Sequence, residues 1–300
     1  MICPEFLDQG DSIALVASAR KVSKKEVQYA IDRIASEGYK VVETPNLYAS
    51  QNQFAGTDKQ RAYDLLWALR NKDIKAILCA RGGYGTIRTL SHIEYKDLAS
   101  NPKWIIGYSD ITVFHSMLNR VGIMSLHATM PLSFPENTED SIKYLFNFIS
   151  GNIPANYIFD GDKLNVEGVV EGELIGGNLS VLYSVRGTKY EQDYSNKILF
   201  IEDLDEYLYH IDRMMMNFSE SGILSNLSGV IVGDMIDMHD NSIPFGKNAK
   251  EIIYSHLKSL KIPVAFISGI GHGKRNLPLL LGSKIKLKTT LSKTEIYFSL

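Results

Sequence analysis

The sequence predicts an α/β protein of two domains, in which a doubly wound N-terminal domain precedes a C-terminal domain of mixed α and β structure. In the first half, apolar runs of strand length alternate with amphipathic helical segments. Strands that alternate with helices imply right-handed crossovers and a parallel sheet covered on both faces. In the second half, short apolar runs are mixed with helical stretches, which predicts the second domain.

The elements of the first half are predicted from hydrophobic periodicity. The run at residues 12–19 is continuously apolar and ends in small residues, and Thr57 is placed to cap a helix. The predicted strands are 12–19, 40–44, 74–80 and 104–106, and the predicted helices are 24–38, 57–69 and 111–120.

The character of the chain changes between residues 136 and 165, where Pro, Gly and polar residues surround a helical segment at 141–149. We place a linker at 136–165, between an N-terminal domain of residues 1–135 and a C-terminal domain of residues 166–300. The predicted strands of the second domain are 169–175, 197–201, 228–233, 264–267, 284–287 and 293–298, and its predicted helices are 179–186, 207–218 and 248–260.

The overall composition narrows the classes of partner. Lys plus Arg is 32 and Asp plus Glu is 34, so a net charge of −2 gives no electrostatic reason to expect nucleic acid or an anionic membrane. The chain begins with neither the basic nor the apolar region of a signal peptide, and we expect a cytoplasmic protein. Cys3 and Cys79 match no metal spacing, and Cys79 is expected in the core.

The chain is organised around the stretch from Trp104 to Thr112. An apolar strand ends at Gly107 and a helical pattern begins after Ser109, so this serine lies at a strand-to-helix corner. At such a corner the hydroxyl is held out of the sheet, and the following N–H groups, including that of Asp110, can stabilise negative charge. Ser109 is therefore a candidate nucleophile, and the alternative is an ordinary helix N-cap.

A serine nucleophile needs a base, usually His, which a carboxylate orients. His272 follows a predicted strand and is flanked by glycines that leave its imidazole unobstructed, which makes it the first candidate base. His127 also follows a short predicted strand and is the second candidate. The other histidines are expected to be structural or to lie on the surface.

The carboxylate is expected from Glu202, which ends the hydrophobic strand 197–201. A strand end can hold such a group rigidly near a ligand, and Glu202 is the candidate that orients His272. Asp203 or Asp205 could alternatively cap the helix that begins near Tyr207.

The loop Arg81-Gly82-Gly83-Tyr84-Gly85 lies between a predicted strand and a predicted helix. Its exposed backbone N–H groups can bind a phosphate or supply the second donor of an oxyanion hole. The loop lacks the Lys-Ser/Thr end of a P-loop and is not Gly-x-Gly-x-x-Gly, which makes nucleotide binding the weaker interpretation. The sequence contains no metal-binding motif, and neither a metal nor a cofactor is expected.

Seven motifs, in order, resemble the LD-carboxypeptidases, the group of serine peptidases that also contains the microcin C immunity-type peptidases. The motif Gly-Tyr-Ser-Asp-Ile departs from the Gly-x-Ser-x-Gly of ordinary α/β hydrolases at its last residue and agrees with this family. The matching stretches are 54–58, 79–85, 106–110, 176–179, 200–203, 211–214 and 271–273.

The resemblance implies a Ser-His-Glu triad on Ser109, His272 and Glu202, with an oxyanion hole from the backbone of Asp110 and Gly83. It also implies a Rossmann-like, amidotransferase-like N-terminal domain, a smaller β-rich C-terminal domain, and a site between them. Members are similar in being cytoplasmic homodimers that need no metal. Many remove the terminal D-alanine from a murein tetrapeptide in peptidoglycan recycling.

A carboxypeptidase must also bind a free terminal carboxylate, which is a task for arginine or for N–H groups at a helix N-terminus. Arg81, together with Gly82, and Arg275 are the candidates because they lie near the motifs. Either arginine could instead form a surface or interdomain ion pair.

Three alternative functions stay open. A self-immunity peptidase would cut an amide that joins a peptidyl or aminoacyl group to a nucleotide-like moiety, and it would favour an aromatic platform for the base. The only tryptophans are Trp67 and Trp104, which mildly favours a murein substrate. A non-catalytic small-ligand-binding protein would use Ser109 as a cap. A glutaminase-like amidotransferase needs a Cys nucleophile, and Cys79 is poorly placed for that role.

Overall fold

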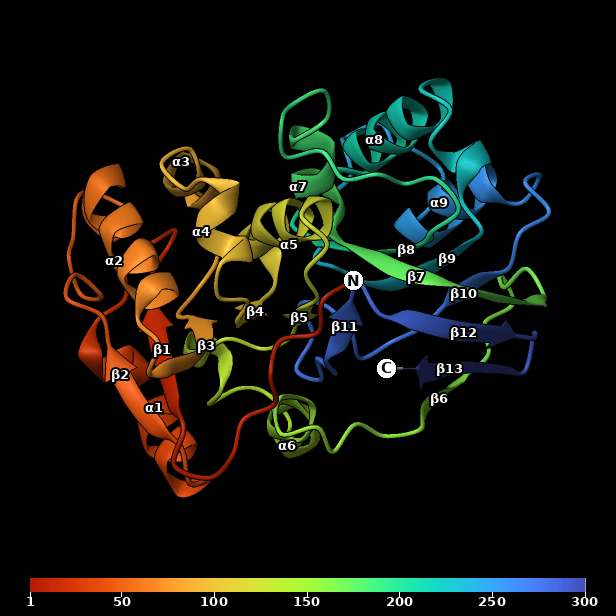
Figure 1. The fold of residues 1–300 in the computed structure, drawn as a ribbon. Coiled ribbons are helices and arrows are strands. Elements are labelled where there is room, and N and C mark those ends of the chain that lie inside the picture. Colours follow the sequence, from red (N-terminus) through yellow and green to blue (C-terminus); the bar gives the residue numbers. More distant parts are fainter. Residues whose placement is uncertain (300) are drawn as a thin grey trace.

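The computed structural model describes residues 1–299, in which two sheets lie side by side (Figure 1). The strands of the first sheet, in spatial order, are β11 (Leu279–Leu281), β5 (Ser125–His127), β4 (Trp104–Gly107), β3 (Ile74–Cys79), β1 (Ser12–Val16) and β2 (Lys40–Glu43). The strands of the second sheet are β10 (Val264–Phe266), β9 (Gly229–Ile236), β8 (Ile198–Leu204), β7 (Gly168–Asn178), β12 (Lys284–Thr289), β13 (Lys293–Ser299) and β6 (Asn156–Asp160).

Helices accompany both sheets, and short 3-10 turns occur at Ser109–Ile111, Pro131–Ser133 and Leu224–Asn226. The helices are α1 (Lys24–Ser36), α2 (Asp58–Arg70), α3 (Thr86–Leu90), α4 (Tyr95–Ala99), α5 (Thr112–Arg120), α6 (Glu139–Ile149), α7 (Leu179–Ser184), α8 (Leu208–Glu220) and α9 (Ala249–Leu257). Within the described part of the chain, no helix combines the length and the apolar character needed to cross a bilayer.

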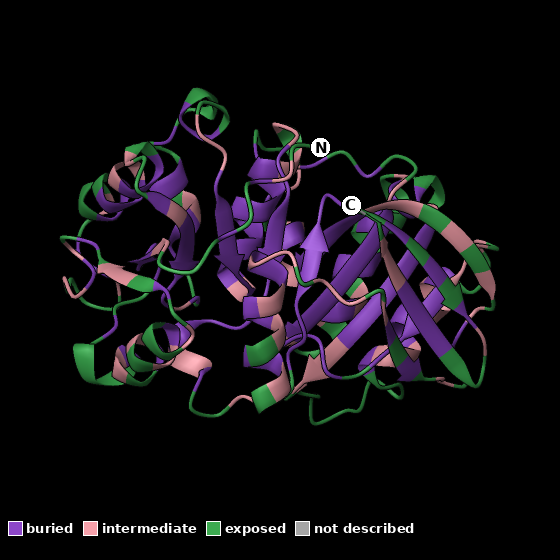
Figure 2. Ribbon diagram, turned by 60° about the horizontal axis from the view of Figure 1, so that its bottom comes forward, coloured by how far each residue is buried: buried purple, intermediate pink, exposed green. Residues whose placement is uncertain are grey.

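Strand β1 illustrates why the first sheet is covered on both faces. Successive side chains of a strand point to opposite faces. Ile13 and Leu15 pack in one apolar cluster with helices α1 and α6, whereas Ala14 and Val16 pack in another with helices α2 and α5. Figure 2 shows that most residues of the central strands of this sheet are buried. The predicted doubly wound domain is therefore confirmed.

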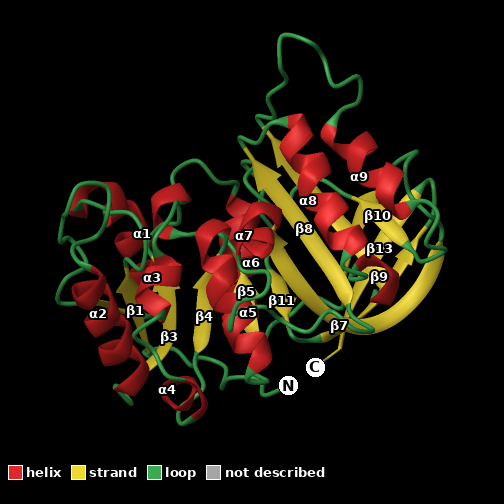
Figure 3. Cartoon of the chain, turned by 90° about the horizontal axis from the view of Figure 1, so that it is seen from above, coloured by secondary structure: helices red, strands yellow, loops and turns green. Residues whose placement is uncertain are grey.

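The second sheet has two parts that differ in strand direction. Strands β7 to β10 are parallel to one another, and α7, α8 and α9 cover one face of this part (Figure 3). Strands β12, β13 and β6 are antiparallel. In β12, buried side chains such as Ile285 and Leu287 alternate with exposed lysines, as expected of a strand with one solvated face. The prediction of a mixed, β-rich second domain is confirmed.

Two strands were not predicted, and both connect distant parts of the chain. Strand β11 follows His272 in the sequence but pairs antiparallel with β5 in the first sheet. Strand β6 lies within the predicted linker 136–165 and pairs with β13, and the same linker contains α6. Strands of three to five residues show too little periodicity to be recognised. The exact domain boundaries stay a prediction.

One apolar cluster runs through both sheets. It includes Leu126 of β5, Leu280 of β11 and Phe200 of β8, all fully buried. Because the interior is continuous, side chains at the strand ends of the two sheets are held at fixed positions relative to one another.

Candidate functional site

A cavity of about 500 Å³ lies where strand ends of the first sheet meet those of the second. Four stretches that the sequence analysis singled out contribute to its wall, although they are distant from one another in the chain. These contributions are Arg81 with Gly82 and Gly83, Ser109, Asp203, and His272. Glu202 and Asp110 are buried next to this wall, adjacent in sequence to Asp203 and Ser109.

Ser109 lies at the predicted strand-to-helix corner, between β4 and α5. Its φ of 62° is in the left-handed region, which a residue other than glycine seldom adopts without support from its surroundings. The Ser109 hydroxyl caps neither the 3-10 turn that starts here nor α5, because both begin without a side-chain cap. The helix-cap alternative is therefore wrong, and the hydroxyl is free to serve the cavity.

The glycine loop touches the serine directly. A Cβ atom on Gly82 would lie 3.0 Å from Cβ and 3.1 Å from Oγ of Ser109, and 3.4 Å from the backbone nitrogen of Asp110. Only glycine fits this approach without displacing its neighbours. The backbone of the loop at Gly82 thus lies close both to the hydroxyl of Ser109 and to the backbone nitrogen of Asp110.

The side chain of Asp110 points away from the cavity and anchors the corner. Its carboxylate is buried and accepts a 2.8 Å hydrogen bond from the backbone N–H of Thr86, the first residue of α3. Burial raises the pKa of Asp110, and the hydrogen bond from Thr86 partly opposes this rise.

His272 and Glu202 form a buried pair. Nδ1 of His272 lies 2.6 Å from Oε2 of Glu202, whose side chain is fully buried on β8. Burial disfavours the imidazolium, but the charge of Glu202 and its hydrogen bond outweigh this effect and raise the pKa of His272. Because Nδ1 faces the carboxylate, Nε2 is the ring nitrogen left to act on a substrate or a hydroxyl.

Tyr108 packs against this pair. Its ring centroid lies 4.7 Å from that of His272, and its hydroxyl lies 3.1 Å from Oγ of Ser133. The residue before the candidate nucleophile therefore helps to fix the orientation of the imidazole.

Asp203 does not have the helix-capping role that was its alternative interpretation. Its carboxylate accepts hydrogen bonds of 2.8 Å from Nδ2 of Asn178 and from the backbone N–H of Ser180, at the start of α7. Helix α8, which begins after Tyr207, has no side-chain cap, so neither Asp203 nor Asp205 caps it. Burial and the neighbouring charge of Glu202 raise the pKa of Asp203 to about 7.

A hydrogen bond connects the serine corner to the second sheet. Oγ1 of Thr112, at the start of α5, accepts a 2.9 Å hydrogen bond from the backbone N–H of Asn178. Asn178 ends β7 and is the register partner of Glu202 on β8. The corner is therefore tied to the strands that carry the acid.

The second candidate base does not reach the cavity. His127 is fully buried on β5, with its ring centroid 5.0 Å from that of Phe200, and neither ring nitrogen has a hydrogen-bond partner among the described residues. Burial holds its pKa well below the ordinary value, so it is neutral. His115 binds the Gly107 carbonyl and the Ser125 hydroxyl and is structural, as predicted.

The two arginine candidates are separated by the fold. Arg81 lines the cavity, and its Nη1 donates to the backbone carbonyl of Lys21 at 3.1 Å. Arg275 pairs with Asp140 at 2.8 Å and lines a different cavity. Arg20 also lines the cavity of Ser109, although it was not among the candidates predicted from the sequence. It follows β1 as Arg81 follows β3, and this shared position after a parallel strand was the available signal.

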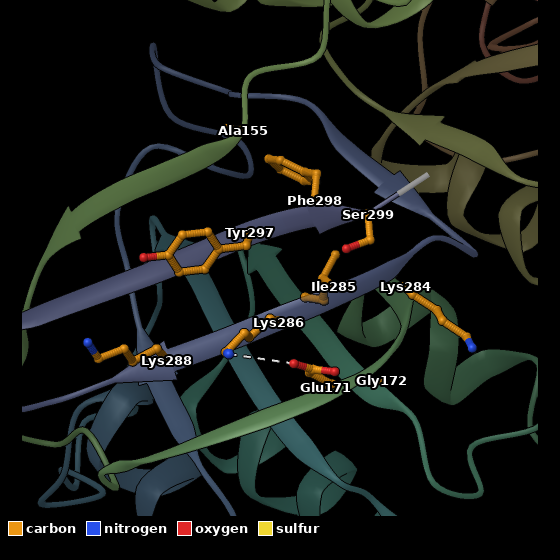
Figure 4. Close-up of a pocket in the computed structure, with 10 residues that line it drawn as sticks. All are labelled: Ala155, Glu171, Gly172, Lys284, Ile285, Lys286, Lys288, Tyr297, Phe298 and Ser299. Atoms are coloured by element: carbon orange, nitrogen blue, oxygen red, sulfur yellow. Dashed lines mark ion pairs between the residues drawn. The ribbon is translucent and has the colours of Figure 1, made fainter.

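A larger cavity, of about 700 Å³, lies over the antiparallel part of the second sheet (Figure 4). Lysines of β12 line it, and Lys286 pairs with Glu171 at 3.6 Å. Its lining residues include no His or Cys, and their one carboxylate, that of Glu171, is paired with Lys286, so this cavity holds nothing like the buried His272–Glu202 pair. The chemistry therefore points to the smaller cavity.

Cys79 is unsuited to be a nucleophile. It is fully buried, as predicted, and burial raises the pKa of its thiol to about 12. This argues against the amidotransferase alternative.

Within residues 1–299, no three His, Cys, Asp or Glu side chains are grouped so that they could hold a metal ion.

Comparisons with known proteins cover nearly the whole chain. The family model described as LD-carboxypeptidase N-terminal domain matches residues 13–128, and that described as LD-carboxypeptidase C-terminal domain matches residues 171–287. A probable murein peptide carboxypeptidase of Bacillus subtilis is 32% identical over 307 residues, covering 98% of this chain and 93% of the relative.

Two further relatives differ in what their names describe. The crystal structure of a muramoyltetrapeptide carboxypeptidase from Oxalobacter formigenes has a TM-score of 0.87 and 27% identity, covering 96% of this chain and 99% of that chain. The microcin C7 self-immunity protein MccF of Escherichia coli is 27% identical over 331 residues, covering 97% of this chain and 95% of the relative.

Proposed function

Because this chain belongs to the LD-carboxypeptidase family, we propose that it removes the terminal D-alanine from murein tetrapeptides, using Ser109, His272 and Glu202 as its triad. The resemblance seen in the seven motifs is confirmed. Family membership makes the protein a serine-type carboxypeptidase, and therefore a hydrolase. The triad, the substrate and a role in peptidoglycan recycling are the proposed part.

The observation that carries the proposal is the 2.6 Å contact between His272 and the buried Glu202, beside a serine held at a φ of 62° on the same cavity. In the proposed mechanism, Oγ of Ser109 attacks the scissile carbonyl while Nε2 of His272 takes its proton. Glu202 fixes the imidazole tautomer and stabilises the imidazolium. His272 then gives the proton to the leaving amine of D-alanine.

An acyl-enzyme on Ser109 completes the first half of the reaction. Water, deprotonated by His272, attacks this ester and releases the shortened peptide. We assign the oxyanion hole to the backbone N–H groups of Asp110 and Gly83, because the glycine loop lies against Ser109 and close to the Asp110 nitrogen.

The cavity supports a peptide substrate over a nucleotide-like one. Among the described residues that line the cavity, Tyr108 is the only Phe, Tyr or Trp. Its ring packs on that of His272. A stacking platform for a base is therefore missing from this described wall. The immunity-type activity is retained as an outcome of the experiment below.

A cytoplasmic location and a homodimer, both implied by the resemblance, stay predictions.

The decisive substitution is Ser109→Ala, assayed by mass spectrometry for release of D-alanine from a murein tetrapeptide. We expect turnover to fall by a factor on the order of 10⁵, since loss of a nucleophile removes the acyl-enzyme route. Ser133→Ala removes another hydroxyl of the same cavity and should keep most of the activity. Near wild-type turnover by Ser109→Ala would contradict the assignment.

A peptide panel tests the substrate. Peptides that differ only in an L- or a D-residue at the end should lose only the D-residue. Cleavage of an aminoacyl sulfamoyl adenosine in place of the tetrapeptide would favour the immunity-type activity. Absence of turnover on every compound, together with tight binding of one, would favour the non-catalytic binding protein.

A further inference from the structure

The question that the proposed function leaves open is how the enzyme recognises the end of the peptide. The carboxylate carbon of a C-terminal residue lies only about 2.5 Å from the scissile nitrogen, as standard bond lengths and angles require. The group that binds this carboxylate must therefore line the same cavity as Ser109.

Two side chains with a permanent positive charge line that cavity among the described residues, and they are Arg20 and Arg81. They reach it from neighbouring strands of the first sheet, because β1 and β3 are hydrogen-bonded and parallel and each arginine follows one of them. The carboxyl ends of adjacent parallel strands lie at one edge of a sheet, where ligands of such folds bind.

Arg20 lies close to the candidate oxyanion hole and shares the cavity with Arg81. A Cβ atom on Gly83 would lie 2.6 Å from Cδ and 2.9 Å from Nε of Arg20, so the side chain of Arg20 passes directly over this glycine. Both arginines line the same cavity, and burial together with the charge of Arg20 lowers the pKa of Arg81.

The protein itself leaves this charge largely uncompensated. Within residues 1–299 no carboxylate forms an ion pair with Arg20 or Arg81, in contrast to Arg88 and Arg275, which pair with Asp58 and Asp140. The hydrogen bond that Arg81 donates goes to a backbone carbonyl. Glu26 acts on Arg81 only as a more distant charge. Two like charges held together at a cavity favour an anionic ligand.

The carboxylates that line the cavity come from the other sheet. Asp203, Asp205 and Glu206 belong to the end of β8 and the loop after it, and Asp205 and Glu206 each contact a histidine. One wall is therefore cationic and the other anionic, so a substrate with a terminal carboxylate enters with that end toward the arginines.

We propose that Arg20 and Arg81 together bind the terminal carboxylate of the substrate and thereby restrict the enzyme to the last residue of a peptide. The inference rests on the proposed function, which supplies the position of the scissile bond. A guanidinium pairs with a carboxylate through two parallel hydrogen bonds, which gives orientation as well as affinity. Of the two arginines that the sequence suggested as carboxylate ligands, Arg81 keeps this role and Arg275 does not. Arg20 is added as the second ligand.

The test compares a tetrapeptide that ends in D-alanine with the same peptide ending in D-alanine carboxamide. Wild-type enzyme should prefer the acid. In Arg20→Gln and in Arg81→Gln, kcat/KM for the acid should fall on the order of 10- to 100-fold, whereas kcat/KM for the carboxamide should stay within about threefold of wild type. The double substitution should remove the preference for the acid.

Arg70→Gln serves as the matched control. Arg70 is exposed, pairs with Asp97 at 2.8 Å and ends α2, at the edge of the sheet opposite the cavity. It should behave as wild type with both peptides. Thermal unfolding of each variant shows whether the fold is retained.

Binding is measured separately, so that the two proposals can fail independently. Calorimetry with the two peptides should show the acid bound more tightly than the carboxamide, and the difference should disappear in the arginine variants. Wild-type protein that binds the acid preferentially but releases no D-alanine would overturn the proposed function and leave the arginine assignment standing. Equal losses on both peptides, or no preference for the acid in either assay, would overturn the arginine assignment.

Discussion

The serine corner and the His272–Glu202 pair are built in different ways. Ser109 is positioned by its immediate neighbours in the chain, because a strand ends at Gly107 and a helix begins at Thr112. His272 and Glu202 are 70 residues apart and meet only because the loop that follows β10 packs against β8. One half of the site is local, and the other depends on long-range packing.

This difference determines how each half can be damaged. The serine corner stores strain in its backbone, so a small steric change next to it should displace the hydroxyl. The His272–Glu202 pair contains a buried carboxylate, so a change in one partner should alter the proton affinity of the other. The substitutions below separate these two sensitivities.

Among the substitutions that compare the two halves, the largest effect is expected from Glu202→Gln. The amide keeps the size of the side chain but carries no charge to stabilise the imidazolium, and its NH2 group can hold the tautomer in which Nε2 is protonated. We expect kcat to fall by about 10³- to 10⁴-fold with a smaller change in KM. Steady-state kinetics on the tetrapeptide measure this, and Glu206→Gln, a carboxylate on the cavity wall outside the triad, is the comparison. Equal kcat in Glu202→Gln and wild type would remove Glu202 from the mechanism.

A smaller effect is expected from Gly82→Ala. The added methyl would lie 3.0 Å from Cβ and 3.1 Å from Oγ of Ser109, so the serine must move by a few tenths of an ångström. Misplacement of a nucleophile on this scale should lower kcat on the order of 10- to 100-fold. Thermal unfolding should change little, which would locate the damage at the corner. A variant with wild-type kcat would show that the corner tolerates the contact.

The pH dependence of kcat/KM tests the His272–Glu202 pair. His272 acts as a base only when neutral, and Glu202 raises its pKa, so activity should rise with pH through a midpoint above that of a free imidazole. Glu202→Gln removes the main cause of the rise, so the residual activity should have its midpoint at lower pH. Asp203, with a pKa of about 7, raises the pKa of His272 less than Glu202 does, and Asp203→Asn should retain most of the shift. An unchanged midpoint in Glu202→Gln would contradict this assignment.

The smallest effect is expected from Thr112→Val, which breaks the hydrogen bond between the two halves. Valine has nearly the same shape but leaves the buried N–H of Asn178 without its 2.9 Å acceptor. The free energy of unfolding should fall by about 1 to 3 kcal/mol, as measured by urea denaturation. We expect a loss of kcat smaller than that in Gly82→Ala. A larger loss would mean that this single bond sets the distance between the serine and His272.

Much of the fold followed from local patterns, and the exceptions are short segments. The segments 13–16, 76–79 and 198–201 are continuous apolar runs because the strands there are buried on both faces. Strand β11 is only three residues long, and its pairing with β5 depends on a chain segment some 150 residues away, so no local period revealed it. His127 resembled a base in sequence, but its burial against Phe200 could not be read from its neighbours.

The sequence by itself determined the corner that carries Ser109, since a strand, a glycine and a helical pattern lie next to one another in the chain. It also supplied the candidate acid and base, because Glu202 and His272 occur in recognisable local contexts. Only the tertiary structure decided which groups share a cavity: it joined His272 to Glu202, excluded His127 and Arg275, and added Arg20. The physical reason is that hydrogen bonds and charges act over a few ångströms in space, whereas sequence patterns report only on neighbours along the chain.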